Sequence, residues 1–292
     1  MKRASGELPH FPLHLLLIAF VLITTYPILW VFTIAFSGKQ SLAIVNLPAN
    51  PTLQDRVRAI TPWPEEVSGS NFVSVVSDQP FARWVLNSTV VAGATTILGV
   101  FMACTAAYAF SRFRFPGRRA GLMSFLVSQM FPGTLTLIPL YIILVQWLGL
   151  GSSWIGLILI YACTAIPFCV WMLKGYFDTI PRELEESALM DGASNARIFY
   201  QIVLPLAKPA VAVTALFAFM TAWNEFILAA TFMDKEQMYT APVGLRFFVG
   251  GFSQQWGYFA AGSIIVAIPV VILFMFVQKY LVSGLTAGAV KG

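Results

Sequence analysis

The feature that most constrains this chain is a series of six long apolar segments separated by more polar stretches. Crossing about 30 Å of hydrocarbon takes about 20 helical residues, and each segment is long enough to do so. A lone strand would leave its backbone groups unpaired in lipid, so we expect every span to be helical. The sequence therefore predicts an all-α, polytopic membrane protein with six transmembrane helices. They are expected at approximately residues 11–36, 85–110, 121–146, 154–175, 206–231 and 258–282.

The composition supports a membrane protein. The chain is 58% hydrophobic and 11% charged, whereas a soluble domain carries about 25% charged residues. The formal net charge of +5 does not indicate a nucleic-acid partner, because Lys and Arg of membrane proteins collect in cytoplasmic loops. The apolar run from Phe11 to Phe36 exceeds the 7–15 residues of a signal-peptide core, so we interpret it as an uncleaved first span.

The distribution of Lys and Arg predicts the orientation. With the N-terminus inside, twelve of the eighteen basic residues fall on the cytoplasmic side and six on the outside. The short loop 111–120 carries four arginines and the opposite loop 149–153 carries none, and short loops count most in this rule. We therefore place both termini and the loop 176–205 in the cytoplasm. The expected divisions are a first helix with a long extracytoplasmic loop, a transmembrane core that contains the loop 176–205, and a cytoplasmic tail, at 1–84, 85–282 and 283–292.

No residue set in the sequence is suited to catalysis or metal binding. The three cysteines lie inside apolar segments in an odd number, which argues against a disulfide framework. The only histidines, His10 and His14, lie together at the start of the first span. There is also no Gly-x-x-x-x-Gly-Lys-Ser/Thr loop to bind phosphates. We therefore expect neither a cofactor nor an enzymatic activity on this chain.

The cytoplasmic segment 176–205 is polar between two apolar spans, and its residues predict two short helices. Pro181 suits a first helical turn, and the acidic residues that follow it favour a helix N-terminus. Gly192 permits the left-handed conformation that ends helices, and Ser194 can cap a second helix running to the Leu204-Pro205 stop. From this pattern alone, the segment could either lie on the membrane or fit a groove of a soluble partner.

The exact pattern of the segment is more specific. Glu186-Ser187-Ala188, three residues, Gly192, nine residues and Ile202-x-Leu204-Pro205 resemble the signature loop of permease subunits in bacterial ABC importers, with Ser187 at the position of an alanine. Other segments resemble the six-span permeases of carbohydrate importers, most of all the smaller permease of maltose/maltodextrin importers. These segments are residues 106–119, 129–132, 173–177, 223–226 and 284–292, and the likeness covers roughly residues 85–292.

This resemblance implies a subunit of an inner-membrane complex. Its partners would be a second, larger permease, two ATP-binding-cassette ATPase subunits that hold ATP and Mg²⁺, and an extracytoplasmic sugar-binding protein. The cytoplasmic segment would be the coupling helix, with contacts from Glu185, Glu186, Ser187, Ala188, Asp191, Gly192, Ile202, Leu204 and Pro205. The C-terminal tail would contact the ATPase through Thr286, Gly288 and Lys291.

Polar residues within the spans are candidates for the translocation path. Asn224 and Glu225 lie in the fifth span, where an ionisable residue is costly and points to a function. They could bond sugar hydroxyls, hold two helices together, or relay protons. Further candidates lie in the third span, which Pro132 and Pro139 should kink. They are Gln129, Thr134, Thr136 and Tyr141.

Three function classes remain to be compared. An ATP-driven sugar importer explains the cytoplasmic motif and is favoured. A proton-coupled secondary transporter would use Glu225 and would not need that motif. A membrane-embedded glycosyltransferase would need an acidic or His cluster at the membrane face, and the cytoplasmic acids instead follow one helix. The sequence does not identify the sugar.

Overall fold

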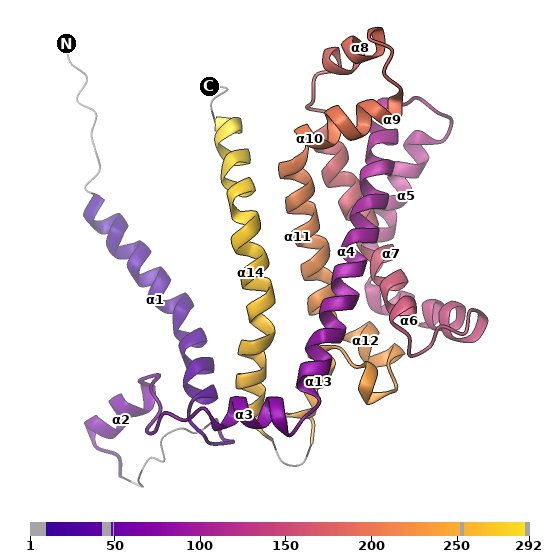
Figure 1. The fold of residues 1–292 in the computed structure, drawn as a ribbon. Coiled ribbons are helices and arrows are strands. Elements are labelled where there is room, and N and C mark those ends of the chain that lie inside the picture. Colours follow the sequence, from indigo (N-terminus) through magenta and orange to yellow (C-terminus); the bar gives the residue numbers. More distant parts are fainter. Residues whose placement is uncertain (1–9, 43–47, 49, 252–253, 290–292) are drawn as a thin grey trace, which may run out of the picture. The chain divides into compact units, whose positions relative to one another are not determined.

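The computed structural model describes residues 10–42, 48, 50–251 and 254–289, and these residues form helices and no strand (Figure 1). The first group of helices is α1 (His10–Ala35), α2 (Leu53–Ile60), α3 (Ser70–Ser77), α4 (Phe81–Arg112), α5 (Arg118–Met130), α6 (Gly133–Tyr141), the π-helical turn η1 (Ile142–Trp147) and α7 (Trp154–Phe177). The second group is α8 (Glu183–Met190), α9 (Asn195–Ile198), the π-helical turn η2 (Phe199–Val203), α10 (Leu204–Leu206), α11 (Lys208–Asn224), α12 (Ile227–Phe232), the 3₁₀ turn η3 (Glu236–Met238), α13 (Ala241–Phe247) and α14 (Trp256–Ala289). The predicted all-α class is confirmed.

Four of the described helices are long and apolar enough to span a membrane, and the number rises to six if two bent helix pairs each count as one span. The four are α1, α4, α7 and α14, which match the first, second, fourth and sixth predicted spans. The helices α7 and α14 run without a break through Pro167 and Pro269, respectively.

The third and fifth predicted spans are not single helices. The third is interrupted at Phe131 and Pro132, and the helical segments on the two sides differ in direction by 108°. This break follows from the missing proline N–H and the restricted residue before it. The fifth, expected over 206–231, is divided into α11, which ends at Asn224, and α12, which begins at Ile227, with Glu225 between them in an extended conformation. A bend of 80° separates Lys208 from the preceding helical segment, which ends at Leu206.

By their contacts, the described residues form two compact units. The first consists of Met1–Phe81 with Leu245–Val266. Here the C-terminal end of α1 is satisfied by Asn71, which is 1% exposed and donates to the Ala35 carbonyl at 3.0 Å. Gln40 donates to the Asn71 carbonyl oxygen at 2.7 Å and accepts from the Tyr258 amide at 3.2 Å. These two amide side chains tie the end of α1 to α3 and to the start of α14.

The second unit consists of Ala82–Gly244 with Ala267–Gly292. Its core lies where α4, α7, α9–η2 and α11 meet, and it includes Ala103, Ala107, Leu173, Phe177, Ile198 and Val203. Small residues on α4 allow the close approach of helices that membrane packing favours. In the same unit, the Trp84 indole packs on Gly244, where an added Cβ would lie 2.0 Å from the ring.

The C-terminal helix continues further than expected. The sixth span was predicted to end at residue 282, with a tail at 283–292, but α14 runs without interruption to Ala289. The functional boundaries 1–84, 85–282 and 283–292 stay a prediction.

Candidate functional site

The cytoplasmic segment folds into two helices joined by a turn, as predicted, and they lie at the end of the second unit where α4 and α7 finish (Figure 1). The helix α8 begins at Glu183, two residues after Pro181, so the proline precedes the helix and is not in its first turn. At its other end Gly192 has φ +82°, and the amides of Gly192 and Ala193 donate to the carbonyls of Leu189 and Ala188. This pattern is a Schellman motif, which needs the left-handed glycine.

The second helix of the segment also begins as its sequence predicts. The Ser194 hydroxyl accepts from the Arg197 amide at 3.3 Å and caps α9. The helical path then continues through η2 and past Pro205 to Leu206, one residue beyond the predicted stop at Leu204-Pro205. The turn to α11 comes at Ala207, and Pro209 occupies the first turn of α11, where its missing N–H leaves no bond unmade.

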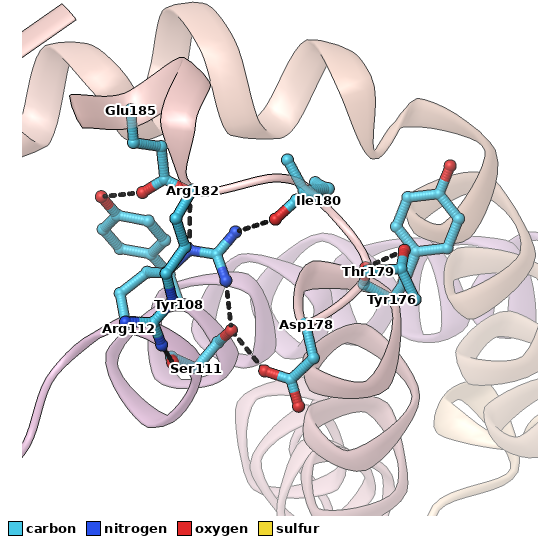
Figure 2. Close-up of polar contacts among 9 residues, drawn as sticks. All are labelled: Tyr108, Ser111, Arg112, Tyr176, Asp178, Thr179, Ile180, Arg182 and Glu185. Carbon is cyan, nitrogen blue, oxygen red and sulfur yellow. Dashed lines mark hydrogen bonds and ion pairs between the residues drawn. The ribbon is translucent and has the colours of Figure 1, made fainter. Parts of the chain in front are cut away.

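A buried ion pair attaches α8 to the end of α4. Arg112, the last residue of α4, donates from Nε to Glu185 Oε1 at 2.6 Å, and the two side chains are 7% and 10% exposed. The Tyr108 hydroxyl donates to the other carboxylate oxygen at 3.4 Å (Figure 2). Both oxygens of Glu185 are therefore used within the chain, and the carboxylate faces inward.

The remaining donors of Arg112 reach the linker between α7 and α8. Its two Nη atoms donate to the Ser111 hydroxyl at 3.0 Å and to the Ile180 carbonyl at 3.1 Å. The Ser111 hydroxyl in turn donates to Asp178 at 2.6 Å, and Arg182 donates to the Ser111 carbonyl at 3.2 Å (Figure 2). One arginine thus holds α4, the linker and α8 in a fixed arrangement.

Asp178 is the second carboxylate of this polar cluster. Lys174, one turn earlier on α7, donates to its other oxygen at 2.6 Å. Partial burial raises the pKa of Asp178, but the hydrogen bonds from Lys174 and Ser111 outweigh this effect and hold the pKa below its ordinary value. The cluster therefore keeps two carboxylates and their cationic partners together at the ends of α4 and α7.

The structure separates the predicted coupling residues into two groups. Glu186, Ser187, Asp191, Gly192 and Pro205 are exposed. Ala188, Ile202 and Leu204 are partly buried and pack against the core of the second unit. Glu185 is 8% exposed and faces Arg112. The interpretation of Glu185 as a surface contact therefore does not fit its position, because the adjacent Glu186 carries the exposed carboxylate.

Two features of this segment were not predicted from its sequence. Arg112 was counted only as a loop charge, although it is the hub of the polar cluster. Met190 ends α8 and is 89% exposed, and Leu184 and Leu189 on the same helix are 46% and 49% exposed. Large apolar side chains gathered outside the spans mark an interaction surface. The motif itself contained this signal, since Leu189 and Met190 stand between its alanine and its glycine.

Within the fifth span, Glu225 takes part in a helix break. Its carboxylate accepts from the amides of Leu228 at 2.8 Å and Ala229 at 3.0 Å, which are unpaired donors at the start of α12. The Tyr161 hydroxyl of α7 donates to the same carboxylate at 2.8 Å. Glu225 therefore caps α12 and connects it to α7, whereas the neighbouring Asn224 is exposed.

The other path candidates lie around the same helices. Gln129 is exposed and donates to the Thr164 carbonyl of α7 at 3.3 Å, one turn after Tyr161. Tyr141 is 37% exposed, and its ring lies 5.7 Å from that of Phe232 in α12. Thr136 is partly buried and donates to the Gly133 carbonyl of its own helix at 2.7 Å.

For three of the predicted residues the structure describes the helical backbone but not the surroundings. They are Thr134 in α6 and both Thr286 and Gly288 in α14. Lys291 lies outside the described residues altogether. Among the described residues, no group of three His, Cys, Asp or Glu side chains is placed to hold a metal ion.

Comparisons with known proteins agree with this geometry. A family described as "Binding-protein-dependent transport system inner membrane component" matches residues 95–287. The chain is 39% identical over 281 residues to the galactooligosaccharides transport system permease protein GanQ of Bacillus subtilis (strain 168), covering 96% of this chain and 94% of that protein. It is 36% identical over 287 residues to the maltose/maltodextrin transport system permease protein MalG of Vibrio vulnificus (strain YJ016), covering 96% and 95%.

The fold also has a solved counterpart. A chain in the crystal structure of a bacterial ABC transporter involved in the import of the acidic polysaccharide alginate superposes with a TM-score of 0.77 at 24% identity, covering 96% of this chain and 99% of that chain. The family match extends over well more than half of the sequence, and the two relatives align along nearly all of it. The chain is therefore a multi-pass membrane protein and a transport component, not an enzyme. It belongs to the inner membrane components of binding-protein-dependent transport systems, the permease subunits of ABC transporters.

Proposed function

We propose that this chain is one of two permease subunits in an ATP-driven importer of oligosaccharides, and that it couples to an ATPase through α8 and α9. The observation that carries the proposal is the rigid attachment of this helix pair to α4 and α7 through Arg112 and Glu185. A segment that only lay on the membrane would not need a buried ion pair at its root. A segment that transmits force does, because a flexible link would absorb the movement.

The exposed side of the segment is the surface offered to the ATPase. Glu186, Ser187, Asp191 and Gly192 face away from the core, next to the exposed Met190. Ala188, Ile202 and Leu204 hold the pair against the core from the other side. The C-terminal residues Thr286, Gly288 and Lys291 are proposed as a second contact with the ATPase. ATP and Mg²⁺ would be bound by two ATP-binding-cassette subunits.

The proposed mechanism is alternating access. Closure of the ATPase pair on ATP would move the α8–α9 pair as a rigid body, and the cluster around Arg112 would pass that movement to α4 and α7. The two permeases would then rock between inward-facing and outward-facing states. A second, larger permease is required because six spans supply only half of a path.

The orientation follows from the excess of basic residues in the loop 111–120 and elsewhere on one side. Both termini and the α8–α9 pair would be cytoplasmic. The loops 37–84 and 232–257 would then face the extracytoplasmic side, where a sugar-binding protein would dock. The substrate is proposed from the relatives, which include permeases for galactooligosaccharides and for maltose/maltodextrin. We favour maltose/maltodextrin or a similar oligosaccharide.

For the spans, we propose that Glu225 has a structural role. All three of its hydrogen bonds connect α12 to α11 and α7. A proton-carrying role would require breaking these bonds at each cycle, and the comparisons do not support a proton-coupled transporter. Gln129, Thr134, Tyr141 and Asn224 remain candidates for contact with the sugar.

Affinity purification of the chain from its native membrane in mild detergent tests the proposal. We expect an ATP-binding-cassette subunit and a second permease to copurify, and the reconstituted complex to take up labelled maltodextrin or galactooligosaccharide only with ATP. Recovery of the chain alone, with uptake that an uncoupler abolishes and ATP does not affect, would instead support the proton-coupled alternative.

A further inference from the structure

The short helix α2 follows α1 in the sequence and precedes α3 and α4, and its apolar side chains are exposed. Its N-terminus is closed by a capping box in which Thr52 and Asp55 bond each other's backbone amides. This arrangement stabilises a short helix without outside help. No residue of α2 is buried. The helix is therefore built to be rigid on a surface, not to fill a core.

One side of α2 is apolar and largely exposed, and its Leu53 and Val57 line an open hollow together with Trp63. Leu53, Val57 and Ile60 are 79%, 53% and 64% exposed, and their spacing of four and three residues places them on one face. Asp55 and Ala59, on the opposite face, are partly buried. Three large aliphatic side chains exposed on one face of a short helix indicate that an apolar surface covers them.

The position of α2 beside α1 indicates what that surface is. The Tyr26 hydroxyl donates to the carbonyl of Ile60, the last residue of α2, at 2.8 Å. Tyr26 lies nine residues before Ala35, the end of α1, which is about 14 Å along the helix axis. The end of α2 is thus held beside the span, not beyond its end. None of the most apolar part of α1 is buried within the chain.

Aromatic side chains mark the same level. Tyr26 and Trp30 are one turn apart on α1, with ring centroids 6.2 Å apart, and Trp63 follows α2 with 70% of its surface exposed. Tyr and Trp collect where the membrane meets water. The apolar stretch Phe11–Ala35 has 25 residues, about 37 Å of helix, which exceeds about 30 Å of hydrocarbon by about 7 Å. With this excess at the Ala35 end, Trp30 lies at the edge of the hydrocarbon and Tyr26 about 6 Å inside it, a depth that interfacial helices reach.

A hollow of about 270 Å³ lies next to these aromatic residues. Leu29 and Phe32 of α1 line it together with Phe36, which follows the helix, and with Trp63 and Val67. The lining is almost entirely apolar and opens beside the span. Its chemistry suits a lipid acyl chain.

We infer that α2 and Trp63 form a lipid-binding platform that lies in the membrane interface. In this arrangement Leu53, Val57 and Ile60 insert among the acyl chains, as amphipathic interfacial helices do. Arg56, which is exposed, would meet headgroup phosphates, whereas the guanidinium of Arg58 lies 3.7 Å from the Glu65 carboxylate. This arrangement rests on the proposed function and restricts the docking surface for a sugar-binding protein. The apolar face of α2 would be covered by lipid, so the binding protein would contact other parts of the loop 37–84. Insertion into either leaflet satisfies the inference.

The test compares two neighbouring positions of α2. Val57→Cys and Arg58→Cys are made in a variant whose three native cysteines are replaced by serine, labelled with an environment-sensitive fluorophore, and reconstituted with the copurifying subunits in phosphatidylethanolamine/phosphatidylglycerol vesicles. Successive helix positions differ by about 100°, so Arg58 is a matched control on another side. Lipids with a doxyl group on the acyl chain report contact with hydrocarbon, and iodide reports contact with water.

We expect doxyl lipids to quench the label at Val57 at least twofold more than at Arg58, and iodide to quench it less. Leu53→Cys should behave as Val57→Cys. Equal quenching of both positions by iodide would overturn the inference, since the face would then be in water. A label at Val57 shielded from both quenchers would also overturn it and would indicate a protein partner. Because the readout needs only insertion into the bilayer, a complex that fails to transport sugar leaves this result interpretable.

Discussion

Replacing Glu185 by alanine should release α8 from the end of α4. The substitution removes the carboxylate that accepts from Arg112 at 2.6 Å and leaves a guanidinium that is 7% exposed without its partner. Breaking a buried ion pair in this way costs about 3–5 kcal/mol. Since every 1.4 kcal/mol is a factor of ten, the population with α8 detached should rise by roughly 10² to 10³ or more.

Hydrogen-exchange mass spectrometry of the purified protein measures this change directly. Amides of residues 183–190 should lose protection by roughly two to three orders of magnitude, while those of α3, in the other compact unit, should not change. Glu186→Ala is the matched control, because it removes an exposed carboxylate one residue away. It should leave exchange in α8 unchanged and weaken association with the ATPase.

A double variant separates the anchoring role from a direct contact. Arg112→Met combined with Glu185→Leu replaces the ion pair by apolar groups of similar volume, which is often neutral for stability. We expect protection of α8 to return in part in this variant, because the Ile180 carbonyl and the Tyr108 hydroxyl also lose their partners. Exchange in residues 183–190 that is the same in wild type and Glu185→Ala would refute the reasoning, because α8 would then not depend on the ion pair.

Other parts of the structure give further predictions. Gly192→Ala places a side chain at φ +82°, which costs about 1–2 kcal/mol. Gly192→Pro should leave the protein inserted in the membrane but uncouple ATP hydrolysis from sugar uptake. Normal uptake by the proline variant would contradict the assignment of residues 183–206 as the coupling segment. Gly244→Ala should lower the melting temperature by overpacking an indole ring, at about 1–3 kcal/mol, while Gly93→Ala in open space should not. Glu225→Ala should reduce the thermal stability and yield of the complex and keep its sugar preference; a changed preference at normal yield would argue for direct sugar contact. The pKa of Asp178 is lowered in the folded state, so the stability of the wild type relative to Asp178→Asn should be greatest above about pH 5 and decrease below about pH 4. The reason is that stabilisation by an ionised carboxylate is lost as the pH falls towards its folded pKa. Denaturant titrations at several pH values measure the difference in stability, and a difference that does not change with pH would contradict the prediction.

The sequence was most informative where local rules decide the structure. Hydropathy located the four unbroken long helices, because each must bridge the hydrocarbon alone. The ends of α8 and α9 followed from Gly192 and Ser194, which act on amides a few residues away. The break at Pro132 was visible as a proline, although the size of the bend was not.

The misses concern residues whose role depends on distant partners. Glu185 and Glu186 are adjacent carboxylates, and only the position of Arg112, more than seventy residues earlier, shows which one faces inward. The helix break at Glu225 was also hidden, since its capping role depends on an extended backbone that Tyr161 helps to hold. In both cases the same residue types could serve a surface or a core, and the packing of α4 and α7 decides between them.

Site-specific photocrosslinking from α8 tests whether this helix contacts an ATP-binding-cassette subunit. A photoreactive amino acid at Met190, which is 89% exposed, would be activated in native membranes, and the captured partner would be identified by mass spectrometry. A matched probe at Leu53 of α2 is the control. We expect the probe at Met190 to capture an ATP-binding-cassette subunit and the probe at Leu53 not to capture one. Capture of lipid alone at Met190, with no ATPase, would contradict the claim that α8 and α9 couple this permease to ATP hydrolysis.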